Sequence, residues 1–319
     1  MKTTGYKTGK KGGFTIVELL TVMSIIILLI SLLVPALTRV RRYAQFVKQK
    51  AQFHSIGVAL DLFNSEQEGY PPSDRLDTAP APGPFSYCGA MKLAEAMVGQ
   101  DLSGFNPNSV FRRDGLDATG TTDLYFPNPG TGNVNFPLYV ENMKSRRMYL
   151  QLENANAYRL TEVYSTAHRA GTNYADTALS PEDANRVLCD VYTRTMATGL
   201  KTGMPILYYK ADTSKILHAE PNTVCTVANN NIYNRCDNQE LVDIPLPWVT
   251  PKGPVHPMAS AGSTILGMTA NAGIFYQKTR DKKISSGDSK PYRADSYILI
   301  SAGFDGEYGT SDDVFNFDE

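Results

Sequence analysis

The hydrophobic pattern of the chain begins with one long apolar run near the N-terminus. Residues 19–37 read LLTVMSIIILLISLLVPAL, and no charged side chain interrupts them. A helix needs roughly 20 apolar residues to cross the hydrocarbon core of a bilayer. We therefore expect a membrane-spanning helix over about residues 14–37, with Glu18 close to its start.

Helical periodicity continues beyond this run. Apolar residues recur in two neighbouring stripes, which are Val40, Ala44, Val47 and Ala51, and Phe46, Phe53, Ile56, Leu60 and Phe63. The glutamines Gln45, Gln49 and Gln52 fall largely outside this apolar arc. Gly69-Tyr70-Pro71-Pro72 should end the helix. The pattern predicts one helix over residues 14–68, with one stripe under a globular domain and the other against neighbouring helices.

Residues 69–319 predict a mixture of helices and strands. Short helices are expected over 89–102, 180–195 and 272–281, and strands over 204–212 and 295–303. Ser180 would cap the second of these helices, with Pro181 in its first turn. Residues 79–85 (APAPGPF) indicate a turn or linker, and 103–135 an irregular segment. The predicted fold class is α+β, a long helix packed on an antiparallel sheet with large loop-rich insertions.

Composition narrows the function classes. The 31 basic and 32 acidic side chains give a net charge of −1, so no nucleic-acid partner is expected. The four histidines lack a zinc-protease spacing, and no nucleophile elbow, phosphate loop or dinucleotide motif occurs, so no enzyme is predicted. The cysteines are Cys88, Cys189, Cys225 and Cys236. They allow three pairings or a free state, and Cys225 and Cys236 are close enough in sequence to staple a loop.

The segment before the apolar run contains a processing signal. Lysines precede the stretch KKGGFTIVELL, residues 10–20, and the small residues Gly12 and Gly13 stand ahead of the hydrophobic run rather than after it. A secretory signal has its small-residue cleavage site after the run, where this chain has Thr38, Arg39 and Val40. Cutting after Gly13 would remove only the basic head and leave the hydrophobic helix on the mature protein.

This arrangement resembles the leader of type IV prepilins and type II secretion pseudopilins. The resemblance covers roughly residues 10–36 and implies that a prepilin peptidase cuts between Gly13 and Phe14 and methylates the new amino group. It places Glu18 at the fifth mature position and matches Pro35 to the helix-kinking proline of the family. Residues 1–13 would be the leader, 14–68 the long helix, and 69–319 an extracytoplasmic domain. The stretch GYPPSD and parts of the later chain are also similar to the major pseudopilin and to large prepilin-like proteins of planctomycete-type bacteria.

The expected role of Glu18 is assembly. A carboxylate at the membrane costs on the order of 2.5–3.5 kcal/mol unless it has a partner. In the family that partner is the amino group of the first residue, here Phe14, on a neighbouring subunit. The alternative is that Glu18 reaches the lipid headgroups.

The chain ends in AGFDGEYGTSDDVFNFDE, where acidic residues crowd a glycine-containing loop. Close carboxylates repel unless a cation lies among them, and calcium accepts 6–8 oxygen ligands. The spacing of Asp305 and Asp312 resembles the calcium loop of major pseudopilins, with Asp313 as a third ligand. A solvated acidic tail is the alternative.

Together these features predict a structural subunit of a type II secretion pseudopilus. Its expected partners are the prepilin peptidase, other pilin or pseudopilin subunits, the inner-membrane assembly platform and membrane lipid. The expected location is the inner membrane, with one span, a periplasmic domain and incorporation into a filament. A type IV pilus subunit, or a membrane-anchored binding protein or enzyme, are the alternatives.

Overall fold

The structure is a computed structural model with two compact units, Met1–Gln45 and Phe46–Glu319. It describes residues 13–75, 87–125, 129–170, 172, 174, 186–219, 230–249, 253–260, 264–265, 268–269, 271, 273–284 and 290–317. The proposed leader residues 1–12, and the predicted linker over 79–85, lie outside the described residues.

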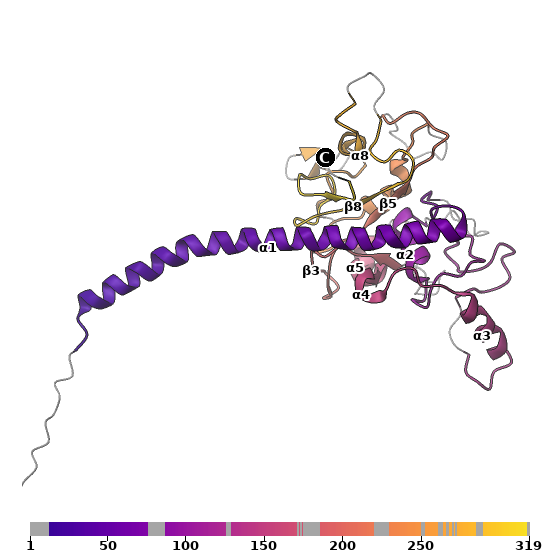
Figure 1. The fold of residues 1–319 in the computed structure, drawn as a ribbon, viewed down its shortest axis with the longest axis horizontal. Coiled ribbons are helices and arrows are strands. Elements are labelled where there is room, and N and C mark those ends of the chain that lie inside the picture. The colour runs from indigo at the N-terminus through magenta and orange to yellow at the C-terminus, as the bar shows by residue number, and fades with distance from the viewer. Residues whose placement is uncertain are drawn as a thin grey trace, which may run out of the picture. The chain divides into compact units, whose positions relative to one another are not determined.

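The long helix α1 spans Ile16–Gln67 and contains Pro35 without a break (Figure 1). Within the first unit its side chains are exposed apart from Gln45, which is half-buried. The hydroxyl groups of this apolar segment bond to carbonyls of their own helix, as in Ser24 to Thr21 at 2.8 Å and Ser31 to Leu28 at 2.8 Å. Such bonds leave no hydroxyl donor unsatisfied in an apolar environment.

In the second unit the C-terminal part of α1 contributes to the core. The predicted stripe is buried from residue 53 onward, at Phe53, Ile56, Leu60 and Phe63. Phe46 and Val47 are exposed, as is Ala51. Of the first stripe, Val47 and Ala51 lie in this unit and are exposed, and of the second stripe only Phe46 is exposed.

Two buried glutamines of α1 contradict the prediction that they lie on a polar face. Gln49 is 0% exposed and its Oε1 accepts from the backbone N–H of Val191 at 3.0 Å. Gln52 donates its Nε2 to the carbonyl of Cys189 at 2.9 Å. Together the two amides pair with the backbone N–H of Val191 and the backbone carbonyl of Cys189, as a neighbouring β-strand would.

The central sheet has three antiparallel strands in the order β5 (Leu207–Lys210), β8 (Tyr297–Ser301) and β9 (Val314–Phe315). Tyr208 pairs with Leu299, so β5 and β8 lie side by side (Figure 1). Every residue of β8 is buried. The strand predictions over 204–212 and 295–303 are confirmed.

The outer edge of β5 is closed by side chains rather than by another strand. Asn238 donates its Nδ2 to the carbonyl of Tyr208 at 2.7 Å, and its Oδ1 accepts from the N–H of Ala90 at 2.8 Å. The N–H of Lys210 donates to Ser73 Oγ at 3.0 Å. These bonds satisfy groups that an open sheet edge would offer to another chain.

Among the described residues, three further sheets have two antiparallel strands each. They pair β1 (Ala157–Arg159) with β2 (Arg186–Leu188), β3 (Arg194–Thr195) with β4 (Lys201–Thr202), and β6 (Thr264–Ile265) with β7 (Met268–Thr269). The chain is therefore mixed, with one long helix and small antiparallel sheets.

Short helices connect these strands. They are α2 (Gly89–Val98), α3 (Phe136–Ser145), α4 (Leu152–Ala155), α5 (Leu160–Val163), α6 (Thr166–Arg169), the 3-10 helix η1 (Arg235–Asp237), α7 (Gln239–Val242) and α8 (Ile274–Thr279). The predictions over 89–102 and 272–281 are confirmed by α2 and α8. All ten residues of α2 are buried, Lys92 and Glu95 included, so it is a core helix and not a half-exposed one.

The helix predicted over 180–195 is wrong in its described part. Residues 186–188 and 194–195 form the strands β2 and β3, and 180–185 lie outside the described residues. Val187, Leu188 and Cys189 are each 0% exposed, and a run of consecutive buried residues suits a core strand. Pairing with β1 and burial outweigh the local helix signal.

The cysteines divide into two kinds. Cys88 and Cys189 are free and buried, and burial raises the pKa of both thiols. Cys236 is disulfide-bonded, while Cys225 lies outside the described residues.

Candidate functional site

The N-terminal end of α1 is stabilised by its own residues. Thr15 precedes the helix, and its Oγ1 accepts from the N–H of Glu18 at 3.2 Å. Glu18 Oε2 accepts in return from the N–H of Thr15 at 2.8 Å and from its hydroxyl at 2.8 Å. This is a reciprocal capping box, which satisfies two backbone donors at the start of a helix. The sequence signal was Thr15-Ile16-Val17-Glu18, a Thr-x-x-Glu step, and the sequence analysis did not use it.

The other N-terminal positions lie in the open. Phe14 is 74% exposed, and no atom lies near the position that a side chain at Gly13 would occupy. Gly12 is outside the described residues. In the described part of the chain, α1 is the one helix long and apolar enough to cross a membrane. By length and composition it is a membrane anchor or a signal sequence.

The acidic C-terminal loop, residues 302–313, connects β8 to β9 and is shaped by glycines. Gly303 has φ 68°, and a Cβ there would stand 2.1 Å from the carbonyl oxygen of Asp312. Gly306 has φ 72°, and a Cβ there would stand 2.6 Å from the ring of Trp248. Glycine is therefore required at both turns, because other residues disfavour this backbone region and no space is left.

Asp305 and Asp312 form a carboxyl pair within this loop. Asp312 Oδ2 accepts from the N–H of Asp305 at 2.9 Å, and its Oδ1 accepts from the hydroxyl of Thr310 at 2.5 Å. Burial, together with the neighbouring Asp312, raises the pKa of Asp305 to about 6. Burial also opposes ionisation of Asp312, but hydrogen bonds from Thr310 and Asp305 outweigh it and lower its pKa. The pair thus shares negative charge at short range.

Asp313 belongs to a different contact. Its Oδ2 lies 3.2 Å from Lys278 Nζ, and the N–H of Gly309 donates to the same oxygen at 3.0 Å. Burial raises the pKa of Asp313 to about 7, and Lys278 opposes that rise. Lys278 therefore already neutralises the carboxylate that the sequence analysis assigned as a third metal ligand.

The loop is braced from outside by aromatic and basic side chains. The Arg194 guanidinium lies 4.5 Å from the centre of the Trp248 ring and donates to the carbonyl of Phe304 at 2.9 Å. Tyr308 is buried, and its N–H donates to His256 Nδ1 at 3.1 Å. Trp248 is the single tryptophan of the chain, so intrinsic tryptophan fluorescence reports on the surroundings of this loop.

The carboxyl pair and the third aspartate differ in their fit to a metal ion. Among the described residues, no group of three or more His, Cys, Asp or Glu side chains is placed to hold one. Asp305 and Asp312 are adjacent and supply hard oxygen donors of the kind calcium prefers. Asp313 is held by Lys278. The donor set therefore fits calcium through the first two residues, and not through all three.

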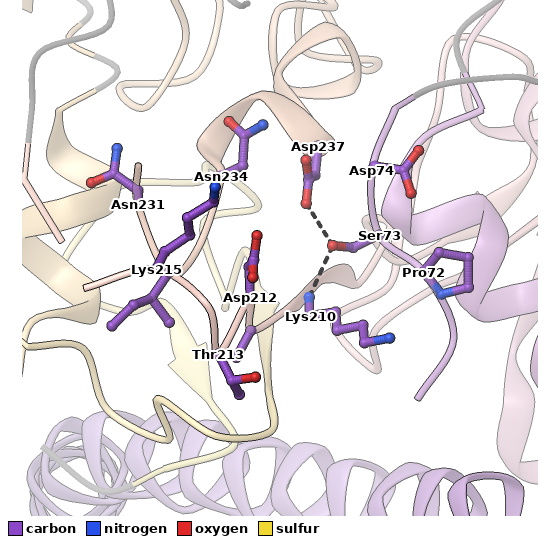
Figure 2. Close-up of a pocket in the computed structure, with 12 residues that line it drawn as sticks. Pro72, Ser73, Asp74, Lys210, Asp212, Thr213, Lys215, Asn231, Asn234 and Asp237 are labelled. Atoms are coloured by element: carbon purple, nitrogen blue, oxygen red, sulfur yellow. Dashed lines mark hydrogen bonds between the residues drawn. The ribbon is translucent and has the colours of Figure 1, made fainter. Parts of the chain in front are cut away.

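A polar cavity of about 510 Å³ lies at the outer edge of β5. We call it the acidic cavity, since three aspartates in its lining, Asp74, Asp212 and Asp237, outnumber the two lysines, Lys210 and Lys215. Figure 2 shows Ser73 between the carboxyl of Asp237 and the backbone of Lys210. Ser73 Oγ donates to Asp237 Oδ2 at 2.5 Å, and burial raises the pKa of Asp237 to about 7. No sequence motif marked this cavity, because its lining comes from segments far apart in the chain.

Glu95 is a further buried carboxyl that the sequence analysis missed. Its Oε1 accepts from Ser109 at 2.5 Å and Tyr125 at 2.9 Å, and its Oε2 from Tyr87 at 2.6 Å. Burial raises its pKa, while these hydrogen bonds lower it. Glu95 therefore ties the irregular segment after α2 to the core.

No protein-family model, curated protein or solved structure matches this chain. A function is therefore proposed from its residues and their geometry alone.

Proposed function

We propose that the chain is a structural subunit of a type II secretion pseudopilus. It is made as a precursor, anchored in the inner membrane by α1, and cut by the prepilin peptidase between Gly13 and Phe14. The mature protein assembles through α1 with other pilin or pseudopilin subunits on an inner-membrane assembly platform. Its domain lies outside the cytoplasm.

The continuity of α1 carries this proposal. One helix runs from Ile16 to Gln67, so the apolar run and the residues that complete the domain core belong to a single element. A signal sequence cut after the apolar run would have to be cleaved within that helix. Cleavage before the run, at the Gly12-Gly13 step, leaves the helix whole. This favours a retained hydrophobic helix over a discarded one.

The exposed part of α1 suits assembly. In residues 16–37 the apolar side chains are exposed, and in the second unit Val47 and Val58 are exposed while Phe53 and Ile56 are buried. A subunit held in a filament by its helix needs a face of this kind, free of its own domain. Glu18 then leaves its capping box, wholly or in part, to meet the Phe14 amine of a neighbour. That charge pair would reward one axial register of docking.

Calcium at the C-terminal loop is part of the proposal. Asp305 and Asp312 would hold the ion, and it would supply the positive charge that the carboxyl pair lacks. Asp313 would stabilise the loop through Lys278 instead.

A membrane-anchored binding protein is the second candidate. Two observations favour it: Glu18 already has a role within its own helix, and the acidic cavity is large enough for a small molecule. A type IV pilus subunit shares all the N-terminal features of the first candidate.

Mass spectrometry of the N-terminal peptide from native membranes tests the proposal. The expected first residue is Phe14 with a methylated amino group. Loss of cleavage in a strain without prepilin peptidase is the matched control. An intact Met1 start in cells that contain the peptidase contradicts the pseudopilin and pilus assignments and leaves the anchored binding protein.

A further inference from the structure

A second cavity adjoins the acidic cavity and differs from it in charge. Its volume is about 780 Å³, and it lies between residues 213–217 and 290–295, with Ile232 between them. It shares Thr213, Lys215 and Ile232 with the acidic cavity. Because Lys215 lines both cavities, a ligand in one lies close to the charges of the other; Figure 2 shows Lys215 in the lining of the acidic cavity.

The lining of this second cavity, which we call the basic cavity, carries an excess of positive charge. Lys215, Lys290 and Arg293 face one carboxylate, Asp295, so three positive charges against one negative leave a formal charge of +2. The whole chain has a net charge of −1. The basic cavity is therefore a local reversal of sign, which attracts anions.

Lys215 lies near Asp212 and helps to lower the pKa of that carboxyl, but it forms no bond with it. In the described part of the chain, neither Lys215 nor Lys290 makes a side-chain hydrogen bond or ion pair. A lysine ammonium offers three donors. These donors are available to a ligand without first breaking an internal contact.

Arg293 is held in an unfavourable backbone conformation at the rim. Its φ is 53°, in the region that glycine prefers. Tyr233 donates its hydroxyl to the Arg293 carbonyl at 2.5 Å, and the guanidinium lies 4.9 Å from the centre of the Tyr297 ring. Strained residues of this kind cluster at functional sites, where the surroundings hold them in place. Arg293 Nε also donates to Ser296 Oγ at 3.3 Å, and Arg293 lines both the basic cavity and another cavity beside Tyr297.

Apolar side chains complete the wall. Ile216 is 77% exposed and Leu217 45% exposed, and both line the basic cavity. Such side chains gain from being covered by an apolar surface. The cavity therefore combines three cations with an apolar wall.

We propose that the basic cavity binds a small organic anion, a carboxylate or phosphate monoester attached to an apolar body. The anionic group contacts Lys215, Lys290 and Arg293, and the apolar body covers Ile216 and Leu217. Asp212, an exposed carboxylate of the acidic cavity whose pKa is lowered, repels the anionic end and so orients the ligand. This proposal goes beyond filament assembly and does not depend on it.

The test uses the full chain in phosphatidylcholine nanodiscs and phenyl phosphate as the probe, which has little tendency to enter lipid. Isothermal titration calorimetry, with empty nanodiscs subtracted, should show one binding site. Inorganic phosphate should bind at least about tenfold more weakly, because it lacks the apolar body. Phenyltrimethylammonium, which has the same ring and the opposite charge, should not bind.

Variants locate the site. Lys290→Gln and Arg293→Gln should each weaken phenyl phosphate binding by about five- to tenfold, and Ile216→Ser by a smaller factor. Lys201→Gln, at an exposed lysine on β4, is the matched control and should bind like the wild type. Arg293→Gly should lose affinity without a lower melting temperature, because glycine relieves the strained φ.

Two results overturn the proposal. The first is the absence of phenyl phosphate binding to the wild type at millimolar concentrations. The second is wild-type affinity in the Lys290→Gln, Arg293→Gln and Arg293→Gly variants, which would place the binding elsewhere. The melting temperatures of the two Arg293 variants show why affinity is lost. If the melting temperature falls in Arg293→Gln but not in Arg293→Gly, the affinity lost in Arg293→Gly comes from the missing binding contact and not from a fold defect.

Discussion

The carboxylate of Glu18 has one observed role and one proposed role, and the two make different demands on it. The capping box with Thr15 needs an acceptor that returns to the helix start, and an amide oxygen can supply it as well as a carboxylate. The proposed pairing with a neighbouring Phe14 amine needs a negative charge. The sequence pattern of charge pointed to Glu18 alone, although Thr15 stands three residues ahead of it in the Thr-x-x-Glu spacing of a capping box.

Two substitutions separate these roles. Glu18→Gln should keep the helix start and membrane insertion but lower incorporation into filaments, because the charge is lost. Thr15→Ala should reduce the helix-start stability by about 0.5–2 kcal/mol and leave the charge for pairing. Sheared filaments and membrane fractions, measured by immunoblotting, check both. Wild-type assembly of Glu18→Gln would contradict the pairing account.

Burial of Asp237 makes the stability of the fold depend on pH. Its pKa in the folded domain is about 7, above the ordinary 3.8, so the fold favours the protonated form. The stabilisation from this group is fully present below pH 3.8 and is lost as the pH rises through 7. Buried Asp190, whose pKa is also raised to about 7, acts in the same direction.

Asp237→Asn should therefore flatten the pH dependence of stability. An amide can still accept from Ser73 and has no proton to lose, so the free energy of unfolding relative to wild type should improve by on the order of 1–4 kcal/mol between pH 5 and pH 8. Denaturant unfolding of a protein that begins at Phe46 measures this. Asp212→Asn, in the same cavity but at an exposed carboxyl whose pKa is lowered by Ser214, should show no such gain. Equal pH profiles for wild type and Asp237→Asn would contradict the buried-acid account.

Among the elements, those with a strong local pattern were predictable and those made by distant partners were not. The segments that became β5, β8 and α8 combine apolar runs with clear ends, and the structure confirms them. The helix predicted over 180–195 failed because its described part pairs with β1 and β4, whose positions no local pattern contains. Gln49 and Gln52 failed for the same reason, since their partners lie on a segment more than a hundred residues away.

The two glutamines of α1 should act together in positioning the helix on the domain. Gln52→Ala and Gln49→Ala each leave a buried backbone group unpaired, which costs about 1–3 kcal/mol. Because both act on residues 189–191, the double variant should cost less than the sum of the two. Denaturant unfolding measures all three, with exposed His54→Ala as the control. Strict additivity would indicate two independent contacts.

The whole molecule divides into a part whose function depends on exposure and a part whose stability depends on burial. The apolar segment of α1 is exposed within its own unit, whereas the domain buries a core that runs from Phe53 to Phe315. Residue patterns predicted both parts. The contacts of the C-terminal loop could not be predicted, because Lys278, Trp248 and Arg194 approach it from three separate segments.

Calcium binding to the C-terminal loop should stabilise the whole domain and be visible at Trp248. A ligand that binds only the folded state at a hundredfold excess over its Kd adds about 2.7 kcal/mol to stability. A protein that begins at Phe46 should therefore melt at a higher temperature in calcium than in chelator, and Trp248 fluorescence should change, since its ring contacts the loop at Gly306.

The response should weaken below about pH 6, where Asp305 holds a proton that calcium must displace. Asp305→Ala and Asp312→Ala should abolish most of it, whereas Asp117→Ala, at a half-buried carboxylate of another loop, should not. Asp313→Asn should lower the melting temperature equally with and without calcium, because it breaks the contact with Lys278. Identical melting curves in millimolar calcium and in chelator would instead favour a carboxyl pair that is neutralised by protons alone.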